Sequence, residues 1–184
     1  MSSRKPARKQ PAPARRWSWL WLAAVAVAGL GAWVHFRSIG PVEAQIIAPA
    51  PAYSAKHLYS ESANPRADIA AALAKAKRGH KRVILDFGGD WCGDCQVLDI
   101  YFHQPPNADL LDKNFVLAHV WIGHMDRNID VAAKYGVPIN RGVPALAVLT
   151  ADGKVLFAQS TGQFADMRHM DPGSVTEFLK KWKS

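Results

Sequence analysis

Cys92 and Cys95 are the only two cysteines in the chain, and Gly93 and Asp94 separate them. An apolar run at residues 83–87 predicts a buried strand, and a Gly-rich turn at residues 88–91 leads from it to a helix that begins at Cys92. Unpaired N–H groups and the dipole at a helix N-terminus lower the pKa of a thiol placed there. The pattern therefore predicts Cys92 as a nucleophile and Cys95, one helical turn later, as the thiol that closes a disulfide.

Two other uses of a cysteine pair compete with this interpretation. A zinc site normally needs two more cysteine or histidine ligands, and the seven histidines form no short paired motif; they stand at positions 35, 57, 80, 103, 119, 124 and 169. A purely structural disulfide between Cys92 and Cys95 would close a small ring, which restricts the unfolded chain little. We therefore favour redox chemistry.

The elements that position the pair alternate between helices and strands. Asn64 and Pro65 are typical of a helix start, and Gly79 of a helix end. Apolar spacing predicts further helices at residues 92–102, 108–113 and 128–135, and strands at 81–87, 115–121, 145–149 and 154–158. This order predicts an α/β layer fold with a mixed sheet.

Turn and capping residues mark the end of this series. Asp152 and Gly153 predict a hairpin between the last two strands, because glycine tolerates positive φ. Asp171-Pro172 and the capping box from Ser174 to Glu177 predict the start of a C-terminal helix that runs to residue 182.

The positive charge of the chain is concentrated before residue 38. The net charge is +8, from 23 Lys/Arg and 15 Asp/Glu, and seven of the basic residues but none of the acidic ones precede residue 38. The remainder is therefore almost neutral. With neither a basic face nor a recognition motif, the composition excludes nucleic-acid binding.

Residues 17–36 form an apolar stretch whose only ionisable group is His35, and a helix needs about 20 such residues to cross a bilayer. The basic residues before it predict a cytoplasmic N-terminus and an exported C-terminal part. We predict a basic cytoplasmic tail at residues 1–16, a transmembrane anchor at 17–36, a Pro/Ala-rich linker at 37–60 and a folded domain at 61–184. Cleavage of the segment as a signal peptide near Ala44 is the alternative.

The segment VILDFGGDWCGDC, which begins at Val83, resembles the active-site strand and turn of the thioredoxin superfamily. The segments RGVPALAVL and ADGKVL, which follow in the expected order, resemble its proline loop and hairpin. The resemblance covers about residues 65–182 and implies a thioredoxin fold with a central mixed sheet flanked by helices. It also implies a thiol–disulfide oxidoreductase with a redox-active disulfide and no dissociable cofactor or metal. With its predicted anchor, the chain is similar to membrane-anchored thioredoxin-like proteins of the bacterial envelope, single-pass in the inner membrane with the domain on the periplasmic side.

The resemblance implies substrate-contacting roles for three residues. Pro144 would have a cis peptide bond opposite the cysteines, although Pro138 is also preceded by Gly-Val and competes for that role. Val143 would offer its backbone to a substrate segment. Trp91 would shield the disulfide and offer partners a flat apolar contact, with packing in the aromatic core as the alternative.

Asp86 is an acid within an apolar run, and the same resemblance implies that it exchanges a proton with Cys95. Burial is expected to raise the pKa of Asp86. A solvated position at a sheet edge is the alternative. Gly93 and Asp94 are predicted to tune the pair. Asp94 stands where thioredoxin has proline; its charge either helps the helix to start or repels the Cys92 thiolate, which would make the disulfide harder to reduce.

The predicted substrates are exported cysteine-containing proteins, attacked by Cys92 and released by Cys95. The predicted compartment is oxidising, so a membrane electron donor is needed to keep the pair reduced. Two other functions remain open: disulfide oxidation or isomerisation, and copper binding by a metallochaperone that uses soft ligands, for which the sequence offers His124, Met125, Met167, His169 and Met170.

Overall fold

Strand β1 (Arg82–Gly88) leads into the cysteine pair and lies inside a four-stranded sheet of order β2-β1-β3-β4. It pairs in parallel with β2 (Phe115–Trp121) and antiparallel with β3 (Ala145–Leu149). At the far edge, β4 (Val155–Ala158) pairs antiparallel with β3. The predicted mixed sheet is therefore confirmed.

The computed structural model describes residues 56–184. The predicted tail, the predicted transmembrane anchor and residues 37–55 of the predicted linker lie outside this part of the chain. Residues 56–60, the end of the predicted linker, pack against the domain through hydrogen bonds to Asp90 and Gln96. Across residues 56–184, no helix is both long and apolar enough to cross a bilayer.

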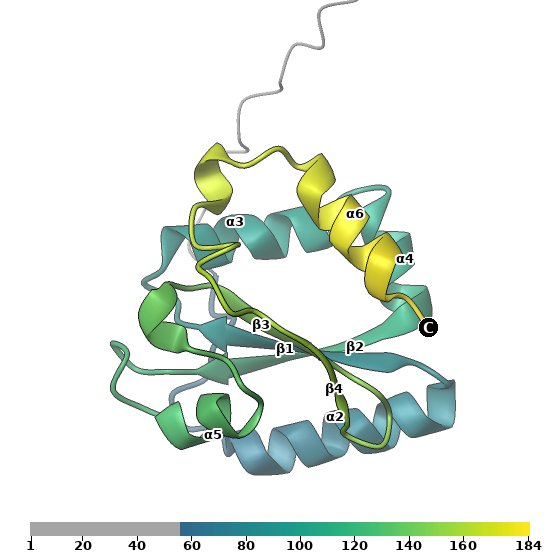
Figure 1. The fold of residues 1–184 in the computed structure, drawn as a ribbon, viewed down its shortest axis with the longest axis horizontal. Coiled ribbons are helices and arrows are strands. Elements are labelled where there is room, and N and C mark those ends of the chain that lie inside the picture. The colour runs from purple at the N-terminus through teal and green to yellow at the C-terminus, as the bar shows by residue number, and fades with distance from the viewer. Residues whose placement is uncertain (1–55) are drawn as a thin grey trace, which may run out of the picture. The chain divides into compact units, whose positions relative to one another are not determined.

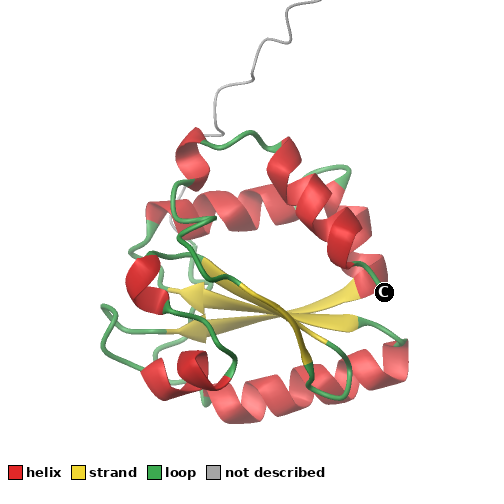
Figure 2. Cartoon of the chain, in the orientation of Figure 1, coloured by secondary structure: helices red, strands yellow, loops and turns green. Residues whose placement is uncertain are grey.

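Helices cover both faces of the sheet (Figure 1 and Figure 2). On one face lie α3, α4 and α6, and on the other lie α2 and α5. Their bounds, with those of two short 3-10 helices, are α2 (Pro65–Gly79), α3 (Gly93–Phe102), α4 (Asn107–Asn114), α5 (Ile129–Lys134), η1 (Ile139–Arg141), η2 (Met167–His169) and α6 (Gly173–Trp182). The order of helices and strands matches the prediction, with boundaries shifted by one or two residues.

The core consists of two hydrophobic clusters. Val83, Leu85 and Phe87 of β1 belong to the cluster shared with α2 and α5, whereas Ile84 belongs to the cluster shared with α3, α4 and α6. This division follows from the alternation of side chains along a strand. Because β1 is buried between the two clusters, the residues that follow it are held in a fixed position.

The start of α6 confirms the predicted role of Asp171-Pro172 but not that of the capping box. The helix begins at Gly173, and the carboxylate of Asp171 accepts a hydrogen bond of 2.8 Å from the Gly173 N–H. Ser174 therefore lies inside the first turn, and its buried hydroxyl has no hydrogen-bond partner within residues 56–184. The predicted capping box is wrong, because an acceptor three residues earlier in the chain satisfies the helix end first.

Candidate active site

Cys92 is the N-cap residue of α3, and a disulfide joins it to Cys95 with 5.3 Å between the Cα atoms. The backbone N–H of Cys95 donates to the Cys92 sulfur at 3.1 Å, which stabilises negative charge on that sulfur. Cys92 is 6% exposed and Cys95 is 0% exposed. Cys92 is therefore the more accessible of the two sulfurs to a partner disulfide, and Cys95 lies beneath it.

The proline loop faces this pair. The Val143–Pro144 peptide bond is cis, which confirms the prediction for Pro144. The carbonyl oxygen of Val143 lies 3.6 Å from the Cys92 sulfur. Gly142 has a φ of +116°, and a Cβ atom there would lie 2.6 Å from the Cβ of Ala165, so only glycine fits before the loop. A second cis bond, Pro105–Pro106, was not predicted.

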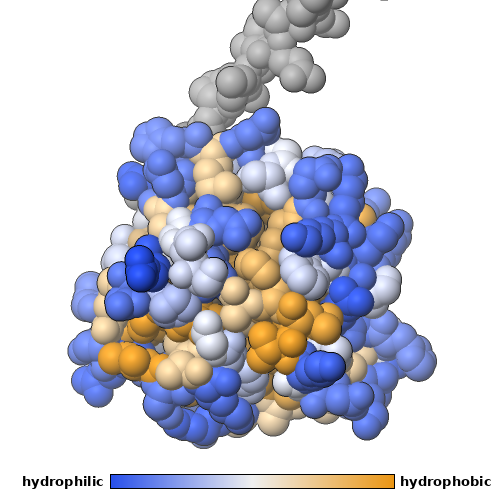
Figure 3. Space-filling model, in the orientation of Figure 1, coloured by the Kyte–Doolittle hydropathy of each residue, from blue (hydrophilic) through white to orange (hydrophobic). Residues whose placement is uncertain are grey.

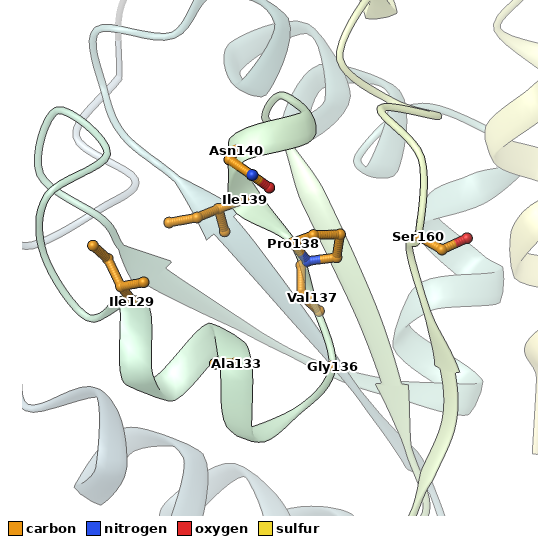
Figure 4. Close-up of a pocket in the computed structure, with 8 residues that line it drawn as sticks. All are labelled: Ile129, Ala133, Gly136, Val137, Pro138, Ile139, Asn140 and Ser160. Atoms are coloured by element: carbon orange, nitrogen blue, oxygen red, sulfur yellow. The ribbon is translucent and has the colours of Figure 1, made fainter.

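Pro138, the competitor for the cis position, has another location. It lines an apolar hollow of about 510 Å³ that Figure 4 shows between α5, the segment that follows it and η1. Neither cysteine borders this hollow, whose lining is completed by Ile129, Ala133, Gly136, Val137, Ile139, Asn140 and Ser160. Pro138 therefore shapes an apolar surface and does not face the disulfide.

Trp91 lies on the surface with 46% of its area exposed. Its indole N–H donates to the Gly123 carbonyl at 2.7 Å, and its ring stacks on His124 with centroids 5.4 Å apart. The alternative of aromatic core packing is wrong. Figure 3 shows other apolar side chains gathered over β4 and beside α5 on the face in view, so exposed apolar area is not confined to Trp91.

Asp86 is completely buried, which excludes the solvated edge position. One of its oxygens, Oδ2, accepts a hydrogen bond of 2.7 Å from the Tyr59 hydroxyl and lies 3.0 Å from Nδ1 of His119. Its other oxygen, Oδ1, has no hydrogen-bond partner within residues 56–184. The Oδ1 atom can therefore receive a further hydrogen-bond donor.

The Tyr59 hydroxyl lies near both this carboxyl and the Cys95 sulfur. A Cβ atom on Gly88 would lie 2.6 Å from the Tyr59 hydroxyl and 2.8 Å from the Cys95 sulfur, so both atoms border the same point of β1. Burial and the neighbouring Asp86 carboxylate raise the pKa of Tyr59 well above its usual value. Tyr59 therefore keeps its proton and donates a hydrogen bond to Asp86.

The segment before Tyr59 is fastened at the N-terminal end of α3. Asp90 accepts hydrogen bonds from the backbone N–H groups of Leu58 and Tyr59, at 2.8 and 3.1 Å. Gln96 exchanges two hydrogen bonds of 2.9 Å with the backbone of Lys56. These contacts place a residue from the predicted linker beside the buried acid.

Asp94, between the cysteines, is held by Arg168 of η2. The guanidinium donates to both carboxylate oxygens at 3.2 and 3.1 Å, and the Arg168 backbone N–H adds a bond of 3.0 Å. The sequence predicted either a helix-starting role or repulsion of the thiolate. The carboxylate lies in the first turn of α3, and Arg168 offsets part of any repulsion.

Two of the five candidate soft-metal ligands, Met167 and His169, make other contacts. Met167 is fully buried in the core with Phe164, and His169 bonds Asp166 at 2.6 Å. Within residues 56–184, no three His, Cys, Asp or Glu side chains gather where they could hold a metal ion.

The family model described as Thioredoxin-like matches residues 64–151. The chain is 35% identical to a disulphide isomerase from Xylella fastidiosa Temecula1 of known structure, with a TM-score of 0.65 over 70% of this chain and 98% of that one. Residues 56–184 form a thioredoxin-like domain. A thioredoxin from Chlorobaculum thiosulfatiphilum is 30% identical over 76 residues, which are 41% of this chain and 62% of that protein. These relatives and the disulfide support a thiol–disulfide oxidoreductase.

The thioredoxin-like domain also contains three site residues that sequence reasoning missed: Tyr59, His119 and Arg168. A signal existed for His119, because it interrupts an apolar run just as Asp86 does, and adjacent parallel strands bring two such residues together. Tyr59 and Arg168 gave no signal. Tyr59 lies in the predicted linker, and Arg168 lies 74 positions from Asp94.

Proposed function

We propose that the thioredoxin-like domain reduces disulfides of exported proteins through Cys92 and Cys95. The Cys92 thiolate attacks a partner disulfide and forms a mixed disulfide. The Cys95 thiol then loses its proton and attacks the Cys92 sulfur, so that the partner leaves reduced and the Cys92–Cys95 disulfide forms. A membrane electron donor returns two electrons to the pair, since the exported compartment is oxidising.

One observation carries this proposal: a buried acid, Asp86, and its hydrogen-bond partner Tyr59 lie near the resolving thiol. The Tyr59 hydroxyl borders the Cys95 sulfur and binds Asp86 at 2.7 Å. Isomerisation can proceed with the nucleophile alone, because it leaves the net number of disulfides unchanged. Net reduction consumes both thiols in every turnover, so a proton acceptor built behind Cys95 favours it.

The reducing direction is proposed from the charges at the start of α3. The Asp94 side chain is 11% exposed, whereas that of its partner Arg168 is 53% exposed. Water and salt screen the exposed cation more than the shielded anion, which leaves a net negative field close to Cys92. Such a field disfavours the thiolate and therefore favours the disulfide, as expected of a pair that gives electrons away.

The N-terminal segment supports the proposed location. Residues 17–36 are long and apolar enough for a single anchor in a bacterial inner membrane, with the domain on the periplasmic side. Exported cysteine-containing proteins would then be the substrates, and the donor would share the membrane.

Equilibration of the full chain with glutathione buffers tests the direction. We expect a reduction potential below about −200 mV, on the reducing side of protein disulfide isomerase. A value near about −120 mV, typical of a strong oxidant, would contradict the proposal.

A disulfide isomerase is the second candidate, because the solved relative at 35% identity is named one. The two functions separate in a Cys95→Ala variant. Isomerisation of a scrambled, multiply disulfide-bonded protein would survive the loss of Cys95, whereas net reduction of insulin would not.

A further inference from the structure

His119 lies between the buried acid and the solvent. It stands opposite Asp86 in the parallel register of β1 and β2, and β2 is an edge strand of the sheet. Its Nδ1 is 3.0 Å from Asp86 Oδ2, and its ring contacts the Tyr59 ring edge-on with centroids 5.0 Å apart. The His119 side chain is 21% exposed, whereas that of Asp86 is 0% exposed. His119 is therefore the point at which this buried cluster reaches the surface.

On its other side, His119 borders a surface cavity of about 420 Å³ between β2, α2 and residues 58–63. Asp68 and Lys75 of α2 are the charged residues in its lining, and Ser60 adds a hydroxyl. The cavity is open to solvent, and its polar lining residues can bind water molecules. It can therefore exchange protons with His119 without opening the core around the disulfide.

We infer that His119 relays the proton of Cys95 between Asp86 and the water of this cavity, an inference that rests on the proposed function. In the neutral tautomer of His119 that leaves Nδ1 without a proton, Asp86 takes the proton from the Cys95 thiol and passes it to Nδ1, and the resulting imidazolium releases its Nε2 proton to water. The Cys95 thiolate attacks the Cys92 sulfur of the mixed disulfide, and the electron pair of the broken bond leaves on the partner's sulfur. Tyr59 positions the Asp86 carboxyl for this transfer.

The charges around His119 suit a group that gains and loses a proton. Burial lowers the pKa of His119, but the hydrogen bond and the charge of Asp86 outweigh it, with smaller contributions from Asp99 and Asp90, so that the pKa is raised. From α2, Asp68 and Lys75 face the cavity with opposite charges. Tyr59 faces the ring as a neutral hydroxyl whose own pKa is raised. The net surroundings are acidic and favour imidazolium as a transient carrier.

The reaction of the reduced full chain with 5,5′-dithiobis(2-nitrobenzoate) separates the two cysteines. Attack by Cys92 releases the first thionitrobenzoate, and attack by Cys95 on the resulting mixed disulfide releases the second. We expect His119→Gln to slow the second release by about tenfold or more and to change its pH profile, with the first release unchanged. Imidazole in the buffer should accelerate the second release in His119→Ala by entering the vacated cavity wall.

The matched control is His103→Gln, because His103 also pairs with an aspartate, Asp99 at 3.1 Å, but follows the C-terminal end of α3. It should leave both releases as in the wild type. An unchanged second release in His119→Gln, or a slow His119→Ala that imidazole does not accelerate, would overturn the relay while leaving the proposed function intact. A wild-type chain that releases only one thionitrobenzoate would overturn the proposed function itself, and the relay with it.

Discussion

Asp94 and Asp86 are two carboxylates at opposite sides of one cysteine pair, and their surroundings differ in kind. Asp94 receives three hydrogen bonds from Arg168, so both of its oxygens are satisfied and its charge is offset. Asp86 receives a hydrogen bond from Tyr59 and lies against His119 with the same oxygen, while the other oxygen has no partner within residues 56–184. The first environment satisfies both carboxylate oxygens, and the second leaves one oxygen without a hydrogen-bond donor among residues 56–184.

The comparison assigns the two acids to different steps. Asp94 stands in the first turn of α3, so its field acts on the Cys92 sulfur and on the balance between thiol and disulfide. Asp86 accepts a hydrogen bond from Tyr59, whose hydroxyl borders the same point of β1 as the Cys95 sulfur, so we propose that Asp86 acts on the resolving step. One site thus separates the control of potential from the control of proton transfer.

The largest expected effect comes from Asp86→Asn. The amide cannot accept the Cys95 proton, so release of the second thionitrobenzoate should slow by about 10²- to 10⁴-fold at neutral pH. Asp94→Asn is the matched control, with the same chemical change on the other side of the pair. It should alter the second release by less than about tenfold. Equal losses in the two variants would remove the distinction between the acids.

Tyr59→Phe should have the next largest effect. It removes a buried donor from Asp86 and should lower the free energy of unfolding of the oxidised chain by about 1–3 kcal/mol in urea titrations. The second thionitrobenzoate release should also slow severalfold. Tyr135→Phe, which removes the hydroxyl of another buried tyrosine in the same core cluster, is the control. If Tyr135→Phe lowered the free energy of unfolding as much as Tyr59→Phe does, the hydrogen bond from Tyr59 to Asp86 would have no special role.

Substitutions at Asp94 and Arg168 should change the rate of Cys92 alkylation by iodoacetamide a few-fold in opposite directions. The rate is measured in a Cys95→Ala background between about pH 6 and about pH 9. Asp94→Asn removes a negative charge and should lower the pKa of Cys92, whereas Arg168→Gln should raise it. The double variant should return close to the starting profile, because the two opposite charges are removed together. A double variant that keeps the full shift of either single variant would contradict this account.

The smallest expected effect is a change in pH-dependent stability. Folding raises the pKa of His119, so protonation of the imidazole stabilises the folded state. This contribution is fully present below about pH 6.5, the usual pKa of histidine, and is lost as the pH rises through the raised pKa of the folded state. The difference in free energy of unfolding between the wild type and His119→Gln should therefore shrink from about pH 5.5 to about pH 8.5. A difference that grows with pH would contradict the Asp86–His119 contact.

Local sequence patterns predicted most of the fold and half of the site. The apolar runs at Phe115–Trp121 and Ala145–Leu149 become strands with the predicted bounds, because buried strands need continuous apolar residues. The cysteines and Pro144 carry their own signal in residue type and spacing. The partners of the two acids carry no such signal, because they are distant in the sequence. Tyr59 and His119 lie 27 and 33 positions from Asp86, and Arg168 lies 74 positions from Asp94. Their contacts depend on sheet register and on the packing of η2 against α3, which spacing alone does not reveal.

Trapping of the mixed disulfide tests most directly whether Cys92 is the nucleophile and Cys95 the resolving thiol. The reduced full chain is mixed with insulin, and covalent adducts are identified on non-reducing gels and by mass spectrometry. We predict that Cys95→Ala accumulates a stable mixed disulfide through Cys92, that the wild type does not, and that Cys92→Ala forms none, because Cys95 is completely buried. Adducts through Cys95 in Cys92→Ala, or none in Cys95→Ala, would contradict the account.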